Sequence, residues 1–434
     1  MTASFRRSAL PLLAVAALAS GCDLFGSKQD DTTDDIYRQG RIDPNAVSDV
    51  GYVPVQPFYT QASTGTFNAP TDVYVGFDGF VYVTDANGLH VLNRAGQPQR
   101  SVAELGGQPI REAGCVTQDR RLQVYVCALR DTTTEVERKN SVGRDTVVIA
   151  RVSLPVVYRI SGMATGTPKV EDIIWQPYTD LNRVVIRRYP IPEDEQVRFV
   201  GVGVRPDNSI YVARRGPLAA NVPQPYNGVL GYDATGANTG QIIQVSGRRA
   251  SLLSSFNPTD VITTVHPPQR QSFPNTADFF VAQSPLETGD ARPPTAPLAN
   301  AVLSIKVTET TDGITYGPDV SRLGAAQTAT GLYTINRFLN PSDLAFAADG
   351  TNYLFVLDSG KDSLFVFNNA GIEGVAPPPG ARNPAPVKVS FGGAGNGLLT
   401  FNRPQGVAYY DKTVYVADTG NNRIARFRLN TDLE

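Results

Sequence analysis

Residues 401–427 read FNRPQGVAYYDKTVYVADTGNNRIARF and contain three short segments rich in β-branched and aromatic residues. These segments are Gly406–Tyr410, Val414–Ala417 and Ile424–Phe427, and they are separated by Asp411–Lys412 and by the polar run Asp418–Asn422. β-Branched and aromatic residues favour strands, whereas Asp, Asn and Gly favour tight turns. The stretch therefore predicts a three-stranded antiparallel meander.

A meander of this size cannot bury both of its faces alone, so further copies are expected in the chain. Clear copies occupy residues 70–96 and 340–371, and weaker ones begin near Gly114, Val200 and Asn257. The central strands of the six copies align on Val81, Val124, Ile210, Phe279, Leu354 and Val414. Their spacing is long and irregular, which indicates that several copies carry insertions.

Six meanders with many turn signals, and no long helical periodicity, predict an all-β fold. We expect a six-bladed β-propeller of four-stranded antiparallel blades. A β-sandwich is the structural alternative, but it explains the repeated order of strand, turn, strand, polar turn and strand less well. A length of 434 residues would allow two or three domains, whereas a propeller takes this length as one.

The stretch 401–427 resembles the NHL repeat. The matching residues are Pro404, Gly406, Val407, Val414–Asp418, Gly420, Asn421–Ile424 and Phe427. The copies at 70–96 and 340–371 match the repeat in part. The resemblance implies a propeller and a family used mostly for binding, but it names no ligand.

The last meander has three strands, so its fourth strand is expected from elsewhere in the chain. Val50–Thr60 (VGYVPVQPFYT) is the unassigned strand-like run upstream of residue 70. We predict that it pairs beside Ile424–Leu429 and closes the ring. Pro54 and Pro57 suit an outermost strand, where a missing N–H is tolerated.

The N-terminus reads as a targeting signal. Arg6 and Arg7 precede the apolar run Ala9–Ala19, and small residues then lead to Cys22. This pattern resembles a bacterial lipobox, which implies a signal peptide over residues 1–21 and lipidation of Cys22; an ordinary secretory signal with an incidental cysteine is the alternative. Residues 22–50 predict a flexible acidic tether, and residues 51–434 the propeller. The expected location is the bacterial cell envelope, with the chain held on a membrane by its lipid.

Three aspartates fall at equivalent positions of the expected innermost strands. Asp72, Asp260 and Asp343 lie in Pro-Thr-Asp, Pro-Thr-Asp and Pro-Ser-Asp, and the other three copies place Gly114, Gly201 and Gly406 there. Carboxylates that converge on a channel could hold Ca²⁺. They could instead accept hydrogen bonds from nearby backbone N–H groups and fix their own blades.

Cys115 and Cys127 are the two cysteines left after Cys22, and both fall in the second copy. We expect Cys115 to lie opposite Tyr125, which puts Cys127 one diagonal step away. A disulfide and a pair of buried thiols both remain open.

No enzyme motif stands out in the sequence. The two histidines cannot supply a multi-histidine zinc site, and no nucleophile elbow, P-loop or dinucleotide fingerprint is present. A net charge of −2 gives no reason to expect nucleic acid as a partner. The sequence favours a scaffold that binds a protein or glycan through its insertions, among them Asp131–Thr146, Pro217–Tyr226, Pro285–Pro297 and Glu373–Pro386. A hydrolase or lyase with a divalent cation at the aspartates, and a structural part of an envelope assembly, are the alternatives.

Overall fold

The computed structural model describes most of the chain after the predicted tether. The described residues are 50–175, 179–180, 185–216, 227–243, 252–253, 255, 257–267, 277–284, 300–322, 330–334, 337–378 and 385–433. Among them, no helix is long and apolar enough to cross a lipid bilayer.

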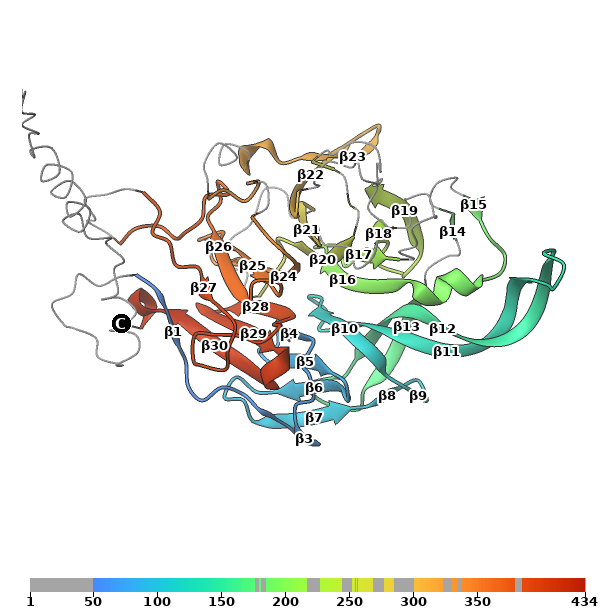
Figure 1. Cartoon of the computed structure of the whole chain (residues 1–434), viewed down its shortest axis with the longest axis horizontal. Coiled ribbons are helices and arrows are strands. Elements are labelled where there is room, and N and C mark those ends of the chain that lie inside the picture. Colours follow the sequence, from blue (N-terminus) through green and yellow to red (C-terminus); the bar gives the residue numbers. More distant parts are fainter. Residues whose placement is uncertain are drawn as a thin grey trace, which may run out of the picture. The chain divides into compact units, whose positions relative to one another are not determined.

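Six four-stranded antiparallel sheets surround a common axis, which makes the protein a six-bladed β-propeller (Figure 1). From the axis outwards, blade 1 contains β4 (Asp72–Val75), β5 (Val81–Asp85), β6 (Gly88–Leu92) and β7 (Pro98–Val102). Blade 2 contains β10 (Arg111–Gln118), β11 (Val124–Lys139), β12 (Asp145–Ser161) and β13 (Lys169–Trp175). Blade 3 contains β16 (Arg198–Val204), β17 (Ile210–Arg215), β18 (Gly228–Tyr232) and β19 (Asn238–Ile243).

Blade 4 contains β20 (Pro258–Thr263), β21 (Phe279–Gln283), β22 (Val302–Thr310) and β23 (Gly313–Pro318). Blade 5 contains β24 (Pro341–Phe346), β25 (Leu354–Asp358), β26 (Ser363–Phe367) and β27 (Phe391–Gly392). Blade 6 contains β28 (Gly406–Tyr410), β29 (Thr413–Asp418), β30 (Arg423–Leu429) and β1 (Tyr52–Pro54). Three short two-stranded pairs complete the sheets: β2 (Gln61–Ala62) with β3 (Gly65–Thr66), β8 (Glu104–Leu105) with β9 (Gln108–Pro109), and β14 (Thr179–Asp180) with β15 (Val185–Ile186). The 3₁₀ turns are η1 (Pro192–Gln196), η3 (Thr419–Asn421) and η4 (Asn430–Asp432).

The six predicted central strands are confirmed as the second strand of each blade. Five of them begin at the expected residue, and Val414 is the second residue of β29. Strands such as β5 and β25 are buried along their whole length because each blade packs against a neighbour on both faces. Buried apolar clusters therefore lie at the six seams between successive blades, two of which are blade 5 with blade 6 and blade 6 with blade 1.

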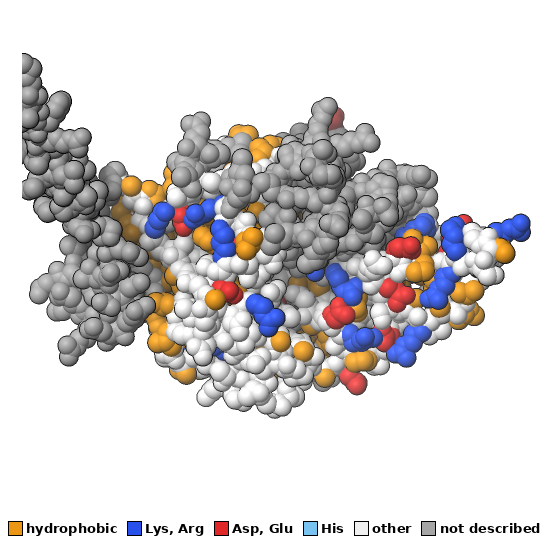
Figure 2. Space-filling view, in the orientation of Figure 1, with side chains coloured by type: hydrophobic (Ala, Val, Ile, Leu, Met, Phe, Trp, Pro, Cys, Tyr) orange, Lys and Arg blue, Asp and Glu red, His pale blue; other side chains and the backbone are white. Residues whose placement is uncertain are grey.

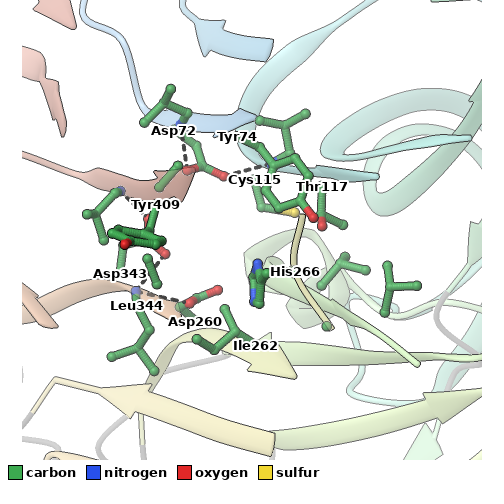
Figure 3. Close-up of a pocket in the computed structure, with 18 of the residues that line it drawn as sticks. Asp72, Tyr74, Cys115, Thr117, Asp260, Ile262, His266, Asp343, Leu344 and Tyr409 are labelled. Atoms are coloured by element: carbon green, nitrogen blue, oxygen red, sulfur yellow. Dashed lines mark hydrogen bonds between the residues drawn. The ribbon is translucent and has the colours of Figure 1, made fainter. Parts of the chain in front are cut away.

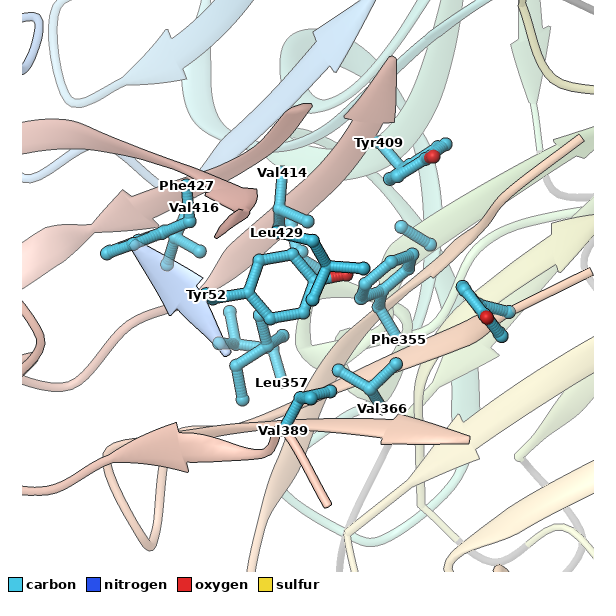
Figure 4. Close-up of a cluster of buried hydrophobic side chains, with 14 of the residues drawn as sticks. Tyr52, Phe355, Leu357, Val366, Val389, Tyr409, Val414, Val416, Phe427 and Leu429 are labelled. Atoms are coloured by element: carbon cyan, nitrogen blue, oxygen red, sulfur yellow. The ribbon is translucent and has the colours of Figure 1, made fainter. Parts of the chain in front are cut away.

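Blade 6 is assembled from both ends of the described chain. Tyr52 of β1 pairs with Leu429 of β30, and the N–H of Val55 donates to the carbonyl of Arg426 at 2.8 Å. Tyr52 is buried and packs against Phe355 of blade 5 with a ring-centroid distance of 6.3 Å (Figure 4). The strand thus covers the edge of β30 and adds a side chain to the seam between blades 5 and 6.

Blade 2 differs from the others because β11 and β12 run far beyond its sheet. The two strands stay paired from Val124 opposite Ile160 to Lys139 opposite Asp145, whereas β10 and β13 pair only with their inner parts. The hairpin projects from the edge of the ring in Figure 1. The predicted insertion at Asp131–Thr146 is therefore an extension of two strands and their turn.

Candidate functional site

The three predicted aspartates are brought together at the axis of the propeller. Asp72, Asp260 and Asp343 lie at the start of the innermost strands β4, β20 and β24, and all three line one axial cavity. Their carboxyl groups point towards one another in Figure 3, and that of Asp343 hydrogen-bonds to both of the others. The three aspartates, which were predicted to occupy equivalent positions of their strands, therefore lie at the same level of the structure.

Each of these aspartates joins its own blade to the next one. The carboxyl of Asp72 accepts from the N–H of Val116 in blade 2 at 2.7 Å, and that of Asp260 accepts from the N–H of Leu344 in blade 5 at 3.2 Å. Asp343 accepts in the same way from the N–H of Val407 in blade 6. The expected bonds within a blade are present too, because Asp72 and Asp343 accept from the N–H groups of Val73 and Leu344 at 2.6 and 2.9 Å. These aspartates therefore fix both their own blade and the next one.

The residue before each aspartate makes a second bond across the same seam. The hydroxyls of Thr71, Thr259 and Ser342 donate to the carbonyls of Ala113, Pro341 and Pro404, at 2.7, 2.7 and 3.2 Å. Each accepting carbonyl lies three residues before the N–H that the aspartate binds. The Pro-[Thr/Ser]-Asp motif therefore works as a two-point clip, in which a hydroxyl and a carboxyl hold the innermost strand of the following blade.

Residues without a bulky side chain occupy this level in two other blades. A Cβ added at Gly201 would lie 2.3 Å from an oxygen of Asp260, and one added at Gly406 would lie 2.5 Å from the Cα of Asp72. In blade 2 the position belongs to Cys115, since the N–H of the next residue, Val116, receives the clip from blade 1. The expectation of Gly114 at this position is wrong by one residue, because β10 has an irregular register between Arg111 and Cys115.

Burial and mutual repulsion favour protons on this carboxyl layer. Burial raises the pKa of Asp72, and the charge of Asp260 adds to the rise. Burial also raises the pKa of Asp260, to about 6. For Asp343, burial and the charges of Asp260 and Asp72 all raise the pKa, which favours a proton on this carboxyl.

The layer brings three carboxyl groups together around one cavity, and the ion site among them stays a prediction. In the described part of the chain, no three His, Cys, Asp or Glu side chains are placed to hold a metal ion. Oxygens that would coordinate Ca²⁺ already accept from backbone N–H groups, those of Val73 and Val116 at Asp72 and that of Leu344 at Asp343. The axial cavity has a volume of about 30 Å³, which is room for about one water molecule.

His266 approaches the same cavity from the segment after β20. Its ring faces Tyr74 of blade 1 at a centroid distance of 6.0 Å, and burial lowers the pKa of His266 to about 4 (Figure 3). Its Nε2 atom is buried without a hydrogen-bond partner among the described residues. Sequence reasoning placed this histidine in a loop, and no periodicity in the surrounding VHPPQR signals that it turns towards the axis.

The polar turn of blade 6 is structural. The carboxyl of Asp418 accepts from the N–H of Asn402 at 2.7 Å and from the side chains of Asn421 and Arg423 at 2.8 and 2.7 Å. The side-chain oxygen of Asn422 accepts from the N–H of Ala69 at 2.8 Å, which ties the turn to blade 1. These contacts explain why Asp, Asn and Arg stand at the end of the second strand in this blade.

The same residues 401–427 match the sequence pattern of the NHL repeat. The chain carries an NHL repeat. No curated protein matches the sequence of this NHL-repeat propeller. Its repeat accounts for one blade by sequence, and the other five blades are recognised by structure.

Several solved structures are similar to this chain, at low sequence identity and with TM-scores below 0.5. One is a protein of unknown function from Bacteroides thetaiotaomicron, with 13% identity, 88% of this chain and 76% of that chain covered, and a TM-score of 0.47. An auxiliary nutrient binding protein from the same species has 11% identity, 87% and 72% coverage and a TM-score of 0.45. A virginiamycin B lyase from Staphylococcus aureus has 12% identity, 88% and 99% coverage and a TM-score of 0.39. Similarity this distant says nothing about a ligand or a reaction.

A disulfide joins Cys115 and Cys127 in blade 2 of the NHL-repeat propeller. The two residues lie directly opposite each other on β10 and β11, with a Cα–Cα distance of 5.0 Å. The expected register, with Cys115 opposite Tyr125, is wrong by two residues. The reason is a longer turn, because Gln118 pairs with Val124 and leaves five residues between the strands.

Several predicted features of the NHL-repeat propeller lie outside the described residues. They are the signal peptide at 1–21, the lipidation site Cys22, the tether at 22–49, and the insertions Pro217–Tyr226 and Pro285–Pro297. The insertion Glu373–Pro386 is described except for residues 379–384. The lipidation of Cys22 therefore stays a prediction.

Proposed function

We propose that this chain is a lipid-anchored β-propeller of the bacterial cell envelope that binds a partner, either a protein or a glycan, through its outer surface. The observation that carries the proposal is the contrast between the axis and the rim. The two axial hollows, of about 30 and 190 Å³, are both below the roughly 300 Å³ at which pockets for drug-sized ligands begin. The rim, in contrast, carries the projecting hairpin of β11 and β12.

The hairpin has one buried face and one free face. Val136, Val152 and Leu154 are buried together, with Trp175 packed against them. On the opposite face, Ile149 lies across from Glu135 and is 77% exposed, and Val147 is also exposed. Because neighbouring exposed apolar side chains mark protein-interaction surfaces, the hairpin favours a protein partner.

The base of the hairpin is braced, so that a partner would meet a pre-ordered surface. The carboxyl of Asp131 accepts from Ser153, Arg151 and Arg111, and the hydrogen bonds from Ser153 and Arg151 lower the pKa of Asp131 to about 2. The N–H of Glu137 also donates to the carbonyl of Pro190 at 2.9 Å. Lys and Arg side chains gather over the free end in Figure 2, which would favour a partner with acidic groups beside its apolar contact.

Crosslinked capture from native membranes tests this proposal. Ile149→Glu puts a charge on the free face of the hairpin and should remove the partner that the unchanged protein captures, without lowering the melting temperature. Val320→Glu is the matched control, because Val320 is 69% exposed at a distant point of the ring. Loss of the partner with both variants, or with neither, would contradict a contact through the hairpin.

Lipid anchoring is tested separately. Replacement of Cys22 by Ser removes the thiol that would be acylated, so the Cys22→Ser protein should move from the membrane fraction to the soluble fraction. If the signal is an ordinary secretory one, Cys22→Ser should leave the distribution between the two fractions unchanged. An unchanged distribution would therefore count against the lipid anchor.

The second candidate is a hydrolase or lyase with a divalent cation at Asp72, Asp260 and Asp343. The convergence of three buried carboxyl groups is the observation that favours it. Metal analysis of the purified protein separates the two functions. The binding scaffold predicts no stoichiometric Ca²⁺ and no change of melting temperature with EDTA, whereas the enzyme predicts one bound ion and a fall in melting temperature that Asp343→Asn abolishes.

A further inference from the structure

A second hollow opens on the other side of the carboxyl layer, at the ends of the innermost strands. Its volume is about 190 Å³, and every blade contributes to its wall. Asp72 and Asp343 form its floor, and Asn340, Gln405 and Arg215 bring longer polar side chains to it. For comparison, an apolar cavity of about 150 Å³ holds a benzene molecule, so this hollow has room for a ligand of about six to eight non-hydrogen atoms.

Arg215 is the charged group of this hollow whose charge is not balanced. It is the last residue of β17, where it pairs through the backbone with Arg198 of β16. Burial lowers the pKa of Arg215, and the positive charge of Arg198 lowers it further. Arg198 itself is neutralised by Glu112 at 2.8 Å, but Arg215 has no ion pair or side-chain hydrogen bond among the described residues.

A mostly buried guanidinium without a partner is costly, and a bound anion would remove that cost. The floor does not repel such an anion strongly. The carboxyl oxygens of the floor residues Asp72 and Asp343 already accept hydrogen bonds from the N–H groups of Val116 and Val407.

The wall offers further hydrogen bonds to the rest of a ligand. The amides of Asn340 and Gln405 are only partly engaged, at 2.8 Å with Ser359 and at 3.5 Å with the carbonyl of Arg403. The hydroxyls of Thr71, Thr259 and Ser342 donate to carbonyls across the seams, so they can still accept. The guanidinium group of Arg215 can bind a carboxylate through two parallel hydrogen bonds, and the nearby amides can bind hydroxyl groups. The hollow therefore suits a ligand that carries both a carboxylate and hydroxyl groups.

We propose that this axial hollow binds a small hydroxylated carboxylate, with its carboxylate on Arg215 and its hydroxyl groups on Asn340 and Gln405. The site is separate from the hairpin, so the proposal holds whether or not the hairpin binds a partner. A carboxylate is favoured over phosphate because its single charge is better matched to one guanidinium above a floor of carboxyl groups. The proposal is for binding, and it assigns no reaction to this hollow.

Calorimetric titration of the purified full-length protein with L-lactate tests the proposal. L-Lactate should bind with one site per chain, and lactamide, which has the same shape without the charge, should not bind. Arg215→Gln should weaken lactate binding by at least about tenfold, which corresponds to the loss of one charged contact. Arg144→Gln, at the exposed tip of the hairpin, makes the same change of charge and should leave binding unchanged.

The melting temperature of the free variants provides a second measurement. Because Arg215 has no side-chain partner in the described part of the chain, Arg215→Gln should melt at the same temperature as the unchanged protein or higher, whereas a purely structural arginine would lose stability on this change. Arg215→Lys keeps the charge without the fork and should bind lactate with intermediate affinity. No binding of lactate, equal binding by Arg215→Gln, or binding of inorganic phosphate in preference to lactate would each overturn the proposal.

Discussion

At the scale of single residues, the axis is held by pairs of short polar side chains. Thr71 with Asp72, Thr259 with Asp260, and Ser342 with Asp343 each bind one carbonyl and one N–H of the next blade. A buried hydrogen bond is costly to leave unmade, so these clips fix the angular position of neighbouring blades. Glycine at 201 and 406 leaves the space that the aspartates of adjoining blades occupy.

The carboxyl layer makes the stability of the ring depend on pH. An unfolded aspartate titrates near pH 3.9, whereas the pKa of Asp260 is raised to about 6 and those of Asp72 and Asp343 are also raised. Between the two pKa values the unfolded chain has lost a proton that the folded chain keeps. The free energy of unfolding therefore falls by about 1.4 kcal/mol per pH unit and per carboxyl in this range. The stability that each protonated carboxyl contributes is fully present below about pH 4 and is lost as the pH rises through its pKa in the folded protein.

We expect Asp343→Asn to remove part of this dependence. His266, with a pKa lowered to about 4, acts with the opposite sign between about pH 4 and 6.5, so the unchanged protein alone cannot separate the groups. The measured quantity is the difference in the free energy of unfolding between Asp343→Asn and the unchanged protein, by urea denaturation from about pH 5 to pH 8. As the pH rises, the free energy of unfolding of Asp343→Asn should increase relative to that of the unchanged protein. A difference that stays constant would show that Asp343 does not carry a displaced proton.

At the scale of elements, turns explain where sequence reasoning succeeded and where it failed. The β-branched and aromatic runs placed the central strands well, since burial on both faces leaves a strong signal in β5, β25 and β29. The register of β10 with β11 was wrong by two residues because the length of the turn after Gln118 leaves no clear mark in QDRRLQ. The length of the hairpin was also hidden, because its charged outer half reads as a loop.

The disulfide of blade 2 gives a prediction at this scale. Cys115 and Cys127 are separated by 12 residues, and a cross-link that closes a loop of this length stabilises a domain by about 3 kcal/mol. Replacing both cysteines by Ala should lower the free energy of unfolding by roughly that amount, as measured by urea denaturation without reductant. A matching check is mass spectrometry after alkylation. Both cysteines should react only after reduction, and their labelling in the untreated, denatured protein would contradict the bond.

At the scale of the whole molecule, the ring could be predicted from the sequence, but the hollow could not. The number of blades and the strand donated by the N-terminal region follow from one meander, its copies and its missing fourth strand. The convergence of the aspartates followed from their equivalent positions. Arg215 gave no such signal, because its isolation depends on which charged residues of other blades come near it. The position of His266 at the axis likewise depends on the path of a single loop. Contacts of this kind are set only when the ring is closed.

Removal of the strand that closes blade 6 should have a large effect. A chain that begins at Phe67 lacks β1 and the bridge between Tyr59 and Ile424, so the edge of β30 loses its partner. It also loses Tyr52 from the seam between blades 5 and 6, and the loss of one buried aromatic side chain alone costs about 3–5 kcal/mol. Its melting temperature should fall steeply. A milder variant, Tyr52→Ala, keeps the strand, and its melting temperature should lie between those of the unchanged protein and the shortened chain.

Hydrogen exchange of the intact protein tests the closed ring most directly. The N–H of Val55 donates to Arg426, and those of Ile424 and Asn430 donate back to Tyr59 and Gly51. If β1 seals the ring, peptides that cover 50–60 and 423–430 should exchange together and as slowly as the central strand β25. Exchange of both peptides within seconds at neutral pH, while β25 stays protected, would mean that blade 6 has an open edge and that the ring is not sealed.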